Sequence, residues 1–138
     1  MPKISEIMTE DVIALPSSSS VQAAAEKMRD ADVGVIVVKD GDKVCGLVTD
    51  RDITVRASAE GLDPAMTPLS AICSKDLASL SPDDDIDRAI GLMRERAVRR
   101  APVVVEEHVI GIVSLGDLAI ERDPDSVLGA ISSAAPSR

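Results

Sequence analysis

Apolar and polar residues follow one pattern along this chain, and the pattern occurs twice. When the sequence is shifted by 65 positions, it aligns with itself without a gap, from Ile4 against Leu69 to Ile53 against Leu118. The two stretches keep the apolar stripe of a helix, a turn glycine and an acidic residue in the same phase. Chance similarity would not hold these features in register, so the chain contains two copies of one supersecondary unit.

Within each repeat, the period of the apolar residues indicates a strand, a helix, two strands and a second helix. The predictions for the first repeat are a strand at residues 12–15, a helix with the stripe Val21, Ala24, Ala25 and Met28, and strands at residues 34–39 and 43–49. Those for the second repeat are a strand at residues 77–80, a helix with the stripe Ile86, Ala89, Ile90 and Met93, and strands at residues 101–105 and 108–114. Clusters of Ser, Pro and Asp precede both first helices and can cap them.

The order β-α-β-β-α in each repeat predicts an α+β fold with α/β-like units. A unit of about 50 residues rarely folds alone, so we expect the copies to share a core with pseudo-twofold symmetry. The expected domains are residues 4–60 and 69–122, joined by a linker at residues 61–68. Residues 123–138 are expected to form a C-terminal tail with a short helix at residues 126–131.

The composition narrows the classes of function. The chain has no Phe, Trp or Tyr, and its net charge is −9. Single strands of nucleic acid are usually held by stacking on aromatic side chains, and an acidic protein repels a phosphate backbone, so we expect no nucleic-acid partner. No apolar run reaches the length of a membrane span, and residues 1–5 do not begin a secretory signal. We therefore expect a cytoplasmic protein without a membrane partner.

Catalytic and metal-binding residues are scarce. Cys45 and Cys73 fit neither a disulfide framework nor a set of metal ligands, so two reduced, partly buried thiols are expected. The single histidine, His108, falls at a predicted turn and is expected at the surface. Three Asp residues at 83–85 could hold Mg²⁺, but the start of a capped helix accounts for them better. Because no nucleophile is paired with a base, we expect neither a metal site nor an enzyme.

The repeats resemble a pair of CBS domains, an arrangement known as a Bateman module. The resemblance is carried by Gly-Leu-Val-Thr-Asp-Arg-Asp at residues 46–52, Gly-Ile-Val-Ser-Leu-Gly-Asp at 111–117, Ile-Met-Thr at 7–9, Ala-Ala at 23–24 and Val-Arg-Arg-Ala-Pro-Val-Val at 98–104. It covers roughly residues 4–120. The segments Thr-Asp-Arg-Asp at 49–52 and Gly-Leu-Asp-Pro at 61–64 are also similar to small stand-alone proteins of two CBS domains.

The resemblance implies a module that binds adenosine-containing ligands in the clefts between its two units. The ligands of the family include AMP, ADP, ATP, NAD(H) and S-adenosylmethionine, taken as regulatory ligands and not as required cofactors. Members pair into disk-like dimers, so a homodimer is also implied. Fused to an enzyme or transporter, the module is the regulatory part; alone, it is a sensor.

The residue types at the end of each repeat suit such a ligand. Thr49 and Ser114 are placed to cap helices whose free first-turn N–H groups form an anion site, and their hydroxyls can donate to phosphate. Asp52 and Asp117 follow one turn later, where a carboxylate can accept hydrogen bonds from ribose hydroxyls. The alternative is that all four residues serve only as caps and as complements to the helix dipole.

Basic residues are distributed unequally between the repeats. Arg99 and Arg100 precede a strand of the second repeat and are candidates for binding phosphate; a solvated pair that contacts carboxylates is the alternative. In the first repeat the candidates are Arg51 and Arg56, with ordinary surface positions as the alternative. We therefore expect the two sites to differ in affinity or in phosphate preference.

Adenine needs a flat apolar slot, and without aromatic residues the slot must be aliphatic. The candidates are Ile13, Val37 and Val103, together with backbone groups that read the ring edge.

These observations predict a non-enzymatic sensor whose adenosine ligand shifts a dimer or partner equilibrium. The alternative is a structural or partner-binding dimerisation module without a physiological ligand, whose protein partner is not identified by the sequence. A nucleotide-processing enzyme is a third hypothesis, but no catalytic constellation supports it. Binding assays separate the first two, because a ligand at 100 times its Kd stabilises the fold by about 2.7 kcal/mol.

Overall fold

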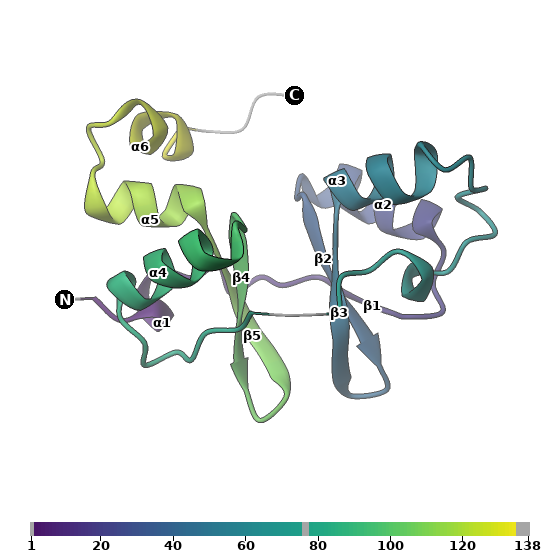
Figure 1. Cartoon of the computed structure of the whole chain (residues 1–138), viewed down its shortest axis with the longest axis horizontal. Coiled ribbons are helices and arrows are strands. Elements are labelled where there is room, and N and C mark those ends of the chain that lie inside the picture. Colours follow the sequence, from purple (N-terminus) through teal and green to yellow (C-terminus); the bar gives the residue numbers. More distant parts are fainter. Residues whose placement is uncertain (1, 76–77, 135–138) are drawn as a thin grey trace. The chain divides into compact units, whose positions relative to one another are not determined.

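The computed structural model describes residues 2–75 and 78–134, and its contacts divide the chain into two compact units (Figure 1). One unit is the continuous stretch Ile13–Leu77, which we call the continuous unit. The other combines Met1–Val12 with Ala78–Arg138, and we call it the split unit. The chain therefore begins in the split unit, builds the whole continuous unit, and then returns.

The continuous unit contains a three-stranded sheet in the order β1-β2-β3. Its elements are β1 (Ala14–Pro16), α2 (Val21–Ala31), β2 (Val35–Asp40), β3 (Lys43–Thr49), α3 (Asp50–Asp52), the π-helix η1 (Ile53–Ser58) and the 3-10 turn η2 (Leu69–Ala71). Strand β1 pairs with β2 in parallel, and β2 pairs with β3 in the antiparallel direction. The predicted helix after Thr49 is thus one α-turn followed by a π-helix.

The split unit contains a two-stranded sheet, β4-β5. Its elements are α1 (Ile4–Ile7), α4 (Ile86–Arg96), β4 (Arg100–Val105), β5 (His108–Ser114), α5 (Leu115–Arg122) and α6 (Val127–Ser132). Part of the strand predicted at residues 77–80 lies outside the described residues, since Leu77 is not among them. In the rest, Leu80 forms a parallel bridge with Val103. The mixture of helices and strands confirms the predicted α+β class.

The first helix of each repeat begins and ends at equivalent positions. The side chains of Ser20 and Asp85 are the N-caps, and they accept hydrogen bonds from Ala23 N–H at 3.0 Å and Arg88 N–H at 2.8 Å. Both helices end at a residue in the left-handed conformation, Asp32 with φ 57° and Ala97 with φ 54°. The Ser/Pro/Asp clusters therefore act as caps, as the sequence predicts.

Each unit is completed by a short segment of the other repeat. We call residues 4–9 the first arm and residues 69–74 the second arm. The first arm belongs to the split unit, where Thr9 bridges Ile112 of β5; the second arm belongs to the continuous unit, where Ser74 bridges Leu47 of β3. Thr9 and Ser74 are equivalent residues of the two repeats, and so are Ile112 and Leu47. The exchange of arms is therefore reciprocal.

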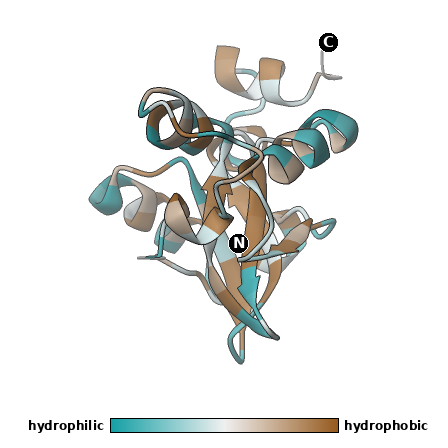
Figure 2. Ribbon diagram, turned by 90° about the vertical axis from the view of Figure 1, so that its right-hand side faces the viewer, coloured by the Kyte–Doolittle hydropathy of each residue, from teal (hydrophilic) through white to brown (hydrophobic). Residues whose placement is uncertain are grey.

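The arms supply core residues. One cluster of buried apolar side chains lies in the continuous unit and includes Leu69, Ile72 and Cys73 of the second arm. The other lies in the split unit and includes Ile4 of the first arm. Ile4 and Leu69 are equivalent residues, and both are fully buried. In Figure 2 apolar residues concentrate along the strands, whereas the helices also carry polar residues. Neither repeat therefore completes a core by itself.

Gly46 and Gly111, expected from the sequence to be turn glycines, lie inside β3 and β5, where the arms pack against these strands. A Cβ on Gly46 would collide with the Ser74 carbonyl oxygen, and one on Gly111 would lie 3.1 Å from the Thr9 carbonyl oxygen and against Met8. Since a Cβ contact below about 3.0 Å forces a shift of the backbone, glycine at position 46 permits the arm to approach the strand. The glycine of the sequence motif is thus explained by packing.

Candidate functional site

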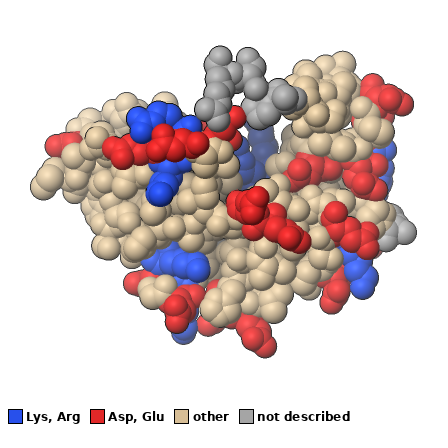
Figure 3. Space-filling model, turned by 180° about the vertical axis from the view of Figure 1, so that it is seen from behind, with Lys and Arg blue, Asp and Glu red and all other residues tan. Residues whose placement is uncertain are grey.

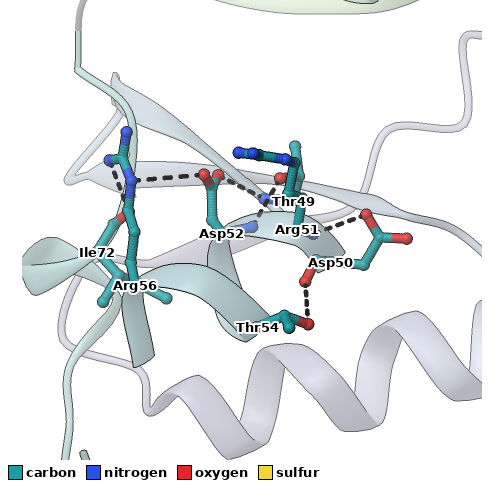
Figure 4. Close-up of polar contacts among 7 residues, drawn as sticks. All are labelled: Thr49, Asp50, Arg51, Asp52, Thr54, Arg56 and Ile72. Carbon is teal, nitrogen blue, oxygen red and sulfur yellow. Dashed lines mark hydrogen bonds and ion pairs between the residues drawn. The ribbon is translucent and has the colours of Figure 1, made fainter. Parts of the chain in front are cut away.

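Thr49 and Asp52 form a reciprocal capping box at the end of β3. The Thr49 hydroxyl oxygen accepts a hydrogen bond from Asp52 N–H at 3.1 Å, and Asp52 Oδ2 accepts one from Thr49 N–H at 2.9 Å (Figure 4). Thr49 is therefore the N-cap that the sequence predicts. Its hydroxyl proton is not used by the box, and Asp52 keeps its second oxygen, Oδ1. Both groups remain able to bind a ligand.

The first-turn N–H groups of this helix are not free. Asp50 N–H donates to the Gly34 carbonyl at 3.1 Å, Arg51 N–H to Asp50 Oδ1 at 2.9 Å, and Asp52 N–H to Thr49. The expectation of an open anion site on these groups is therefore wrong in the first repeat. Because side chains and the residue before β2 already satisfy the donors, phosphate recognition here must come from cationic or hydroxyl side chains.

Arg56 connects Asp52 to the second arm. Its Nε lies 3.7 Å from Asp52 Oδ1, and its Nη1 donates to the Ile72 carbonyl at 3.2 Å (Figure 4). The Asp52 side chain is only 13% exposed, whereas the Arg56 side chain is 51% exposed. The carboxylate is thus held in a sheltered position, and the guanidinium remains open to solvent on one side.

A cavity of about 490 Å³ opens beside this arginine. The lining residues are Arg56, Ser70, Ala71, Cys73, Ser74 and Lys75. All of them belong to the continuous unit, and all except Arg56 lie in or next to the second arm. The cavity is open to solvent over most of its extent, so it is a surface depression and not an enclosed pocket. Two cations and two hydroxyls in one cavity are donor groups suited to an anion.

The second repeat reproduces the capping box. Ser114 Oγ accepts from Asp117 N–H at 3.1 Å, and Asp117 Oδ2 accepts from Ser114 N–H at 2.8 Å. Arg100 lies directly opposite Ser114 in the β4–β5 register, and the Arg99 carbonyl accepts from Leu115 N–H at 2.8 Å. The backbone of the predicted arginine pair therefore lies next to that of Ser114 and Leu115.

The cations of the cavity have no counterpart in the second repeat. Within the alignment of the repeats Lys75 corresponds to Glu10, and the same shift of 65 positions, continued three residues past the end of that alignment, places Glu121 opposite Arg56. Ala71 corresponds to a third acidic residue, Glu6. Acidic side chains also recur, mixed with basic ones, over the face of the molecule in Figure 3. The basic cavity is therefore a local exception in a chain whose net charge is −9.

Other predicted site residues lie in different surroundings. Arg51 is exposed at the start of α3. Of the adenine-slot candidates, Val37 and Val103 are fully buried, and Val103 belongs to the core cluster of the split unit. Ile13 is half-buried and packs against the core of the continuous unit. Val103 is the equivalent of Val38 and not of Val37, so these two valines do not occupy matching positions in the repeats.

The three Asp residues before α4 have separate structural partners. Asp83 pairs with Lys3 at 3.5 Å, Asp84 accepts from Ser81 N–H at 2.8 Å, and Asp85 caps the helix. His108 is exposed at the start of β5. Among residues 2–75 and 78–134, no group of three or more His, Cys, Asp or Glu residues could hold a metal ion. Within the same ranges, no helix is long and apolar enough to cross a membrane.

Sequence reasoning missed Lys75, Ser70 and Ser74. Their signal lies in the comparison of the repeats: Lys75 aligns with Glu10, just as Arg56 aligns with Glu121. The charge at these two positions therefore differs in sign between the repeats, so the basic cavity belongs to the continuous unit. The cavity itself could not be inferred, because it depends on the second arm packing in the continuous unit.

Comparison with known proteins agrees with this architecture. The family model of the CBS domain matches residues 4–58 and 69–122. The CBS domain-containing protein YhcV of Bacillus subtilis is 35% identical over 130 residues, which cover 94% of this chain and 92% of the relative. Hypoxic response protein 1 of Mycobacterium tuberculosis is 32% identical over 115 residues, which cover 83% of this chain and 80% of the relative.

Solved structures give the same result. Hypoxic response protein 1, solved with two coordinated zinc ions, has a TM-score of 0.76 at 31% identity, over 85% of this chain and 96% of that one. The hexameric CBS-CP12 protein from bloom-forming cyanobacteria has a TM-score of 0.80 at 27% identity, over 90% of this chain and 73% of that one. The chain therefore belongs to the CBS domain family and carries two CBS domains in tandem.

Proposed function

We propose that this tandem CBS protein is a non-enzymatic sensor that binds an adenosine-containing nucleotide. The observation that carries the proposal is the basic cavity beside Asp52, in which Arg56 and Lys75 stand out against an acidic chain. A phosphate group is the anion that such a cavity suits, since guanidinium and ammonium groups bind phosphate by charge-assisted hydrogen bonds.

Each part of the ligand has a partner in the first repeat. Asp52 Oδ1, which also pairs with Arg56, accepts hydrogen bonds from ribose hydroxyls, as acidic residues do in dinucleotide sites. The Thr49 hydroxyl donates to an oxygen of the ligand. Arg56, Lys75 and the hydroxyls of Ser70 and Ser74 bind the phosphate. The ion pair with Asp52 and the hydrogen bond to Ile72 hold Arg56 at this position before the ligand arrives.

The second repeat offers a weaker site of the same kind. Ser114 and Asp117 keep the hydroxyl and the carboxylate, and Arg99 and Arg100 supply the positive charge. The acidic residues that replace the cavity cations oppose a phosphate there. The adenine ring, in either repeat, is held by aliphatic side chains such as Ile13 and by backbone groups. We therefore infer two unequal sites, with the tighter one in the first repeat.

The output of the sensor is a change in association. The CBS-CP12 relative from cyanobacteria is hexameric, which supports self-association as a property of this chain too. We infer that the protein forms a homodimer or a larger assembly, and that the nucleotide shifts its equilibrium or its affinity for a protein partner.

Isothermal titration calorimetry with AMP, ADP, ATP, NAD, NADH and S-adenosylmethionine tests the proposal. The variant Arg56→Glu/Lys75→Glu installs the acidic residues of the second repeat and is expected to weaken nucleotide binding more than tenfold. Arg94→Glu/Arg29→Glu makes the same change in charge on exposed helix positions and serves as the matched control. Asp52→Asn should weaken binding of the nucleotides more than binding of inorganic phosphate, because it removes the ribose acceptor, which phosphate does not use, in addition to the ion pair with Arg56.

If none of the six ligands binds the wild-type protein, the sensor proposal is wrong, and a partner-binding module without a physiological ligand replaces it. If the cavity variant and the control lose affinity equally, the net charge and not the cavity is responsible. Turnover of a bound nucleotide would contradict the non-enzymatic assignment.

A further inference from the structure

Cys45 is the extra residue of a bulge in β3. The β2–β3 ladder pairs Val38 with Gly46 and Lys39 with Val44, so that Cys45 has no partner in the register. A bulge redirects the side chain of the extra residue, and Cys45 packs against the core of the continuous unit. Its position on β3 therefore directs a thiol toward the second arm.

Cys73 approaches from that arm. It is 6% exposed and belongs to the same core, and its Sγ lies 3.2 Å from the position of a Cβ on Gly46, the residue after Cys45. Burial, followed by the neighbouring Cys45 thiol and the hydrogen bond between the two, raises the pKa of Cys73. Both cysteines are free thiols. Two unlinked thiols thus face each other where the exchanged arm meets the strand.

The second repeat shows which side chains can pack at the contact between an arm and its strand. Cys45 and Cys73 correspond to Ile110 and Met8. Ile110 is the extra residue of the equivalent bulge, because β4–β5 pairs Val103 with Gly111 and Val104 with Val109. Ile110 and Met8 both pack against the core of the split unit. An apolar pair is therefore sufficient to fix an arm, and thiols are not needed for that purpose.

We propose that Cys45 and Cys73 are a redox-active dithiol, which a hydroperoxide converts into an intrachain disulfide that clamps the second arm to β3. Cys45 is the more exposed of the two and reacts first. Its sulfur attacks the peroxide, so that an S–O bond forms and the O–O bond breaks. The leaving oxygen takes up the Cys45 thiol proton and departs as water (or as an alcohol from an alkyl peroxide).

Cys73 then resolves the sulfenic acid. Its sulfur attacks the sulfur of Cys45, the S–S bond forms, the S–O bond breaks, and the hydroxyl leaves with the Cys73 proton as a water molecule. With hydrogen peroxide, two thiols and one peroxide give one disulfide and two waters, and two electrons pass from sulfur to oxygen. The disulfide closes the chain between residues 45 and 73, across the bridge of Leu47 with Ser74.

The clamp acts on the proposed nucleotide site, and this part of the inference rests on the proposed function. The second arm carries Ile72, whose carbonyl holds Arg56, and it forms most of the cavity wall. Fixing the arm in its paired position removes conformational freedom that a ligand would otherwise have to restrict. The oxidised protein is therefore expected to bind nucleotide at least threefold more tightly than the reduced protein.

Mass spectrometry of the full chain tests the chemistry without any ligand. Reduced protein treated with hydrogen peroxide should lose about 2 Da as a monomer, and digestion should yield one peptide pair joined between residues 45 and 73. The gain of one or three oxygens on a single cysteine, or a disulfide between two chains, would overturn the proposal. The variant Cys45→Ile/Cys73→Met carries the residue pair of the second repeat; it should fold and should not show the loss of about 2 Da under the same treatment.

Calorimetry with ADP then tests the coupling. The expected result is a Kd at least threefold lower for oxidised than for reduced wild type, and no effect of peroxide on the Cys45→Ile/Cys73→Met variant. Equal affinities in the two redox states would overturn the coupling. Failure of the reduced protein to bind ADP or any other nucleotide of the panel, while the disulfide still forms, would refute the proposed function and leave the dithiol assigned.

Discussion

Leu47 and Ser74 exchange two backbone hydrogen bonds, from Leu47 N–H to the Ser74 carbonyl at 3.1 Å and from Ser74 N–H to the Leu47 carbonyl at 2.8 Å. Their equivalents Ile112 and Thr9 do the same in the split unit, at 3.0 and 2.9 Å. These bonds join residues that lie 27 positions apart in the continuous unit and 103 positions apart in the split unit. The stability of each unit therefore depends on a contact between the two repeats.

Substitution of Gly46 by Ala should be strongly destabilising, because its Cβ would collide with the Ser74 carbonyl oxygen and separate the second arm from β3. We expect a loss of roughly 1–3 kcal/mol in the free energy of unfolding, as for overpacking of a rigid core. Urea denaturation followed by circular dichroism measures it. Gly91→Ala is the control: nothing lies within 4 Å of its Cβ, and alanine favours the interior of α4. Destabilisation by both substitutions would contradict the argument.

Loss of the N-caps should weaken both units by similar amounts. Ser20→Ala and Asp85→Ala each remove one side-chain acceptor for a helix N–H group, and each should cost about 1 kcal/mol. Because the caps lie in different units, their effects in the double variant should be nearly additive. Thermal and urea unfolding provide the values. Ser18→Ala changes an exposed residue outside the cap and should have little effect; an equal loss there would argue against capping.

Ala97→Gly should stabilise the split unit. Ala97 ends α4 in the left-handed conformation with φ 54°, which is unfavourable for a residue with a Cβ and is readily adopted by glycine. We expect a gain of roughly 0.5–1 kcal/mol in the free energy of unfolding, measured in urea. The same substitution at Ala89, in the interior of α4, should destabilise. A loss of stability with Ala97→Gly would contradict this prediction, because it would show that the αL conformation of Ala97 does not lower the free energy of unfolding.

Stability should decrease at high pH on account of Cys73. Burial, and then the neighbouring Cys45, raise the pKa of this thiol, so the folded protein holds the proton more firmly than the unfolded chain. The stabilisation is fully present below the ordinary thiol pKa of about 8.5 and is lost as pH rises through the higher folded value. Urea denaturation in reducing buffer from pH 7 to 10 measures the slope. Cys45→Ile/Cys73→Met should have a shallower slope; an identical slope would refute the assignment.

The internal repeat accounts for how much of the fold follows from the sequence. The stripe Val21, Ala24, Met28 lies inside α2, and its equivalent Ile86, Ala89, Met93 lies inside α4, because a periodic apolar face can be buried in only one way. Thr49 and Ser114 are N-caps as predicted, since their hydroxyls satisfy a helix N–H locally. Helix faces and N-caps can be predicted without any knowledge of tertiary contacts, because they depend on residues close together in the sequence.

Features that depend on distant contacts were beyond the sequence analysis. The first-turn N–H groups after Thr49 are satisfied by Gly34, the residue before β2, and by side chains of the turn itself, so the anion site expected at the helix start was wrong. The proximity of Cys45 to Cys73 depends on a bulge and on an arm from the other repeat. The cavity that contains Lys75 depends on the same arm.

The reciprocal arms also indicate how a chain of this kind can arise. A single repeat has one arm and one strand that receives an arm, but here every arm is received by the strand of the other copy. In a protein of one repeat, the arm and the strand could both be paired in this way only if two molecules exchanged their arms. Duplication of its gene in tandem would join two such subunits covalently and make the exchange independent of protein concentration. The present chain thus has the connectivity of an arm-exchanged dimer within a single polypeptide.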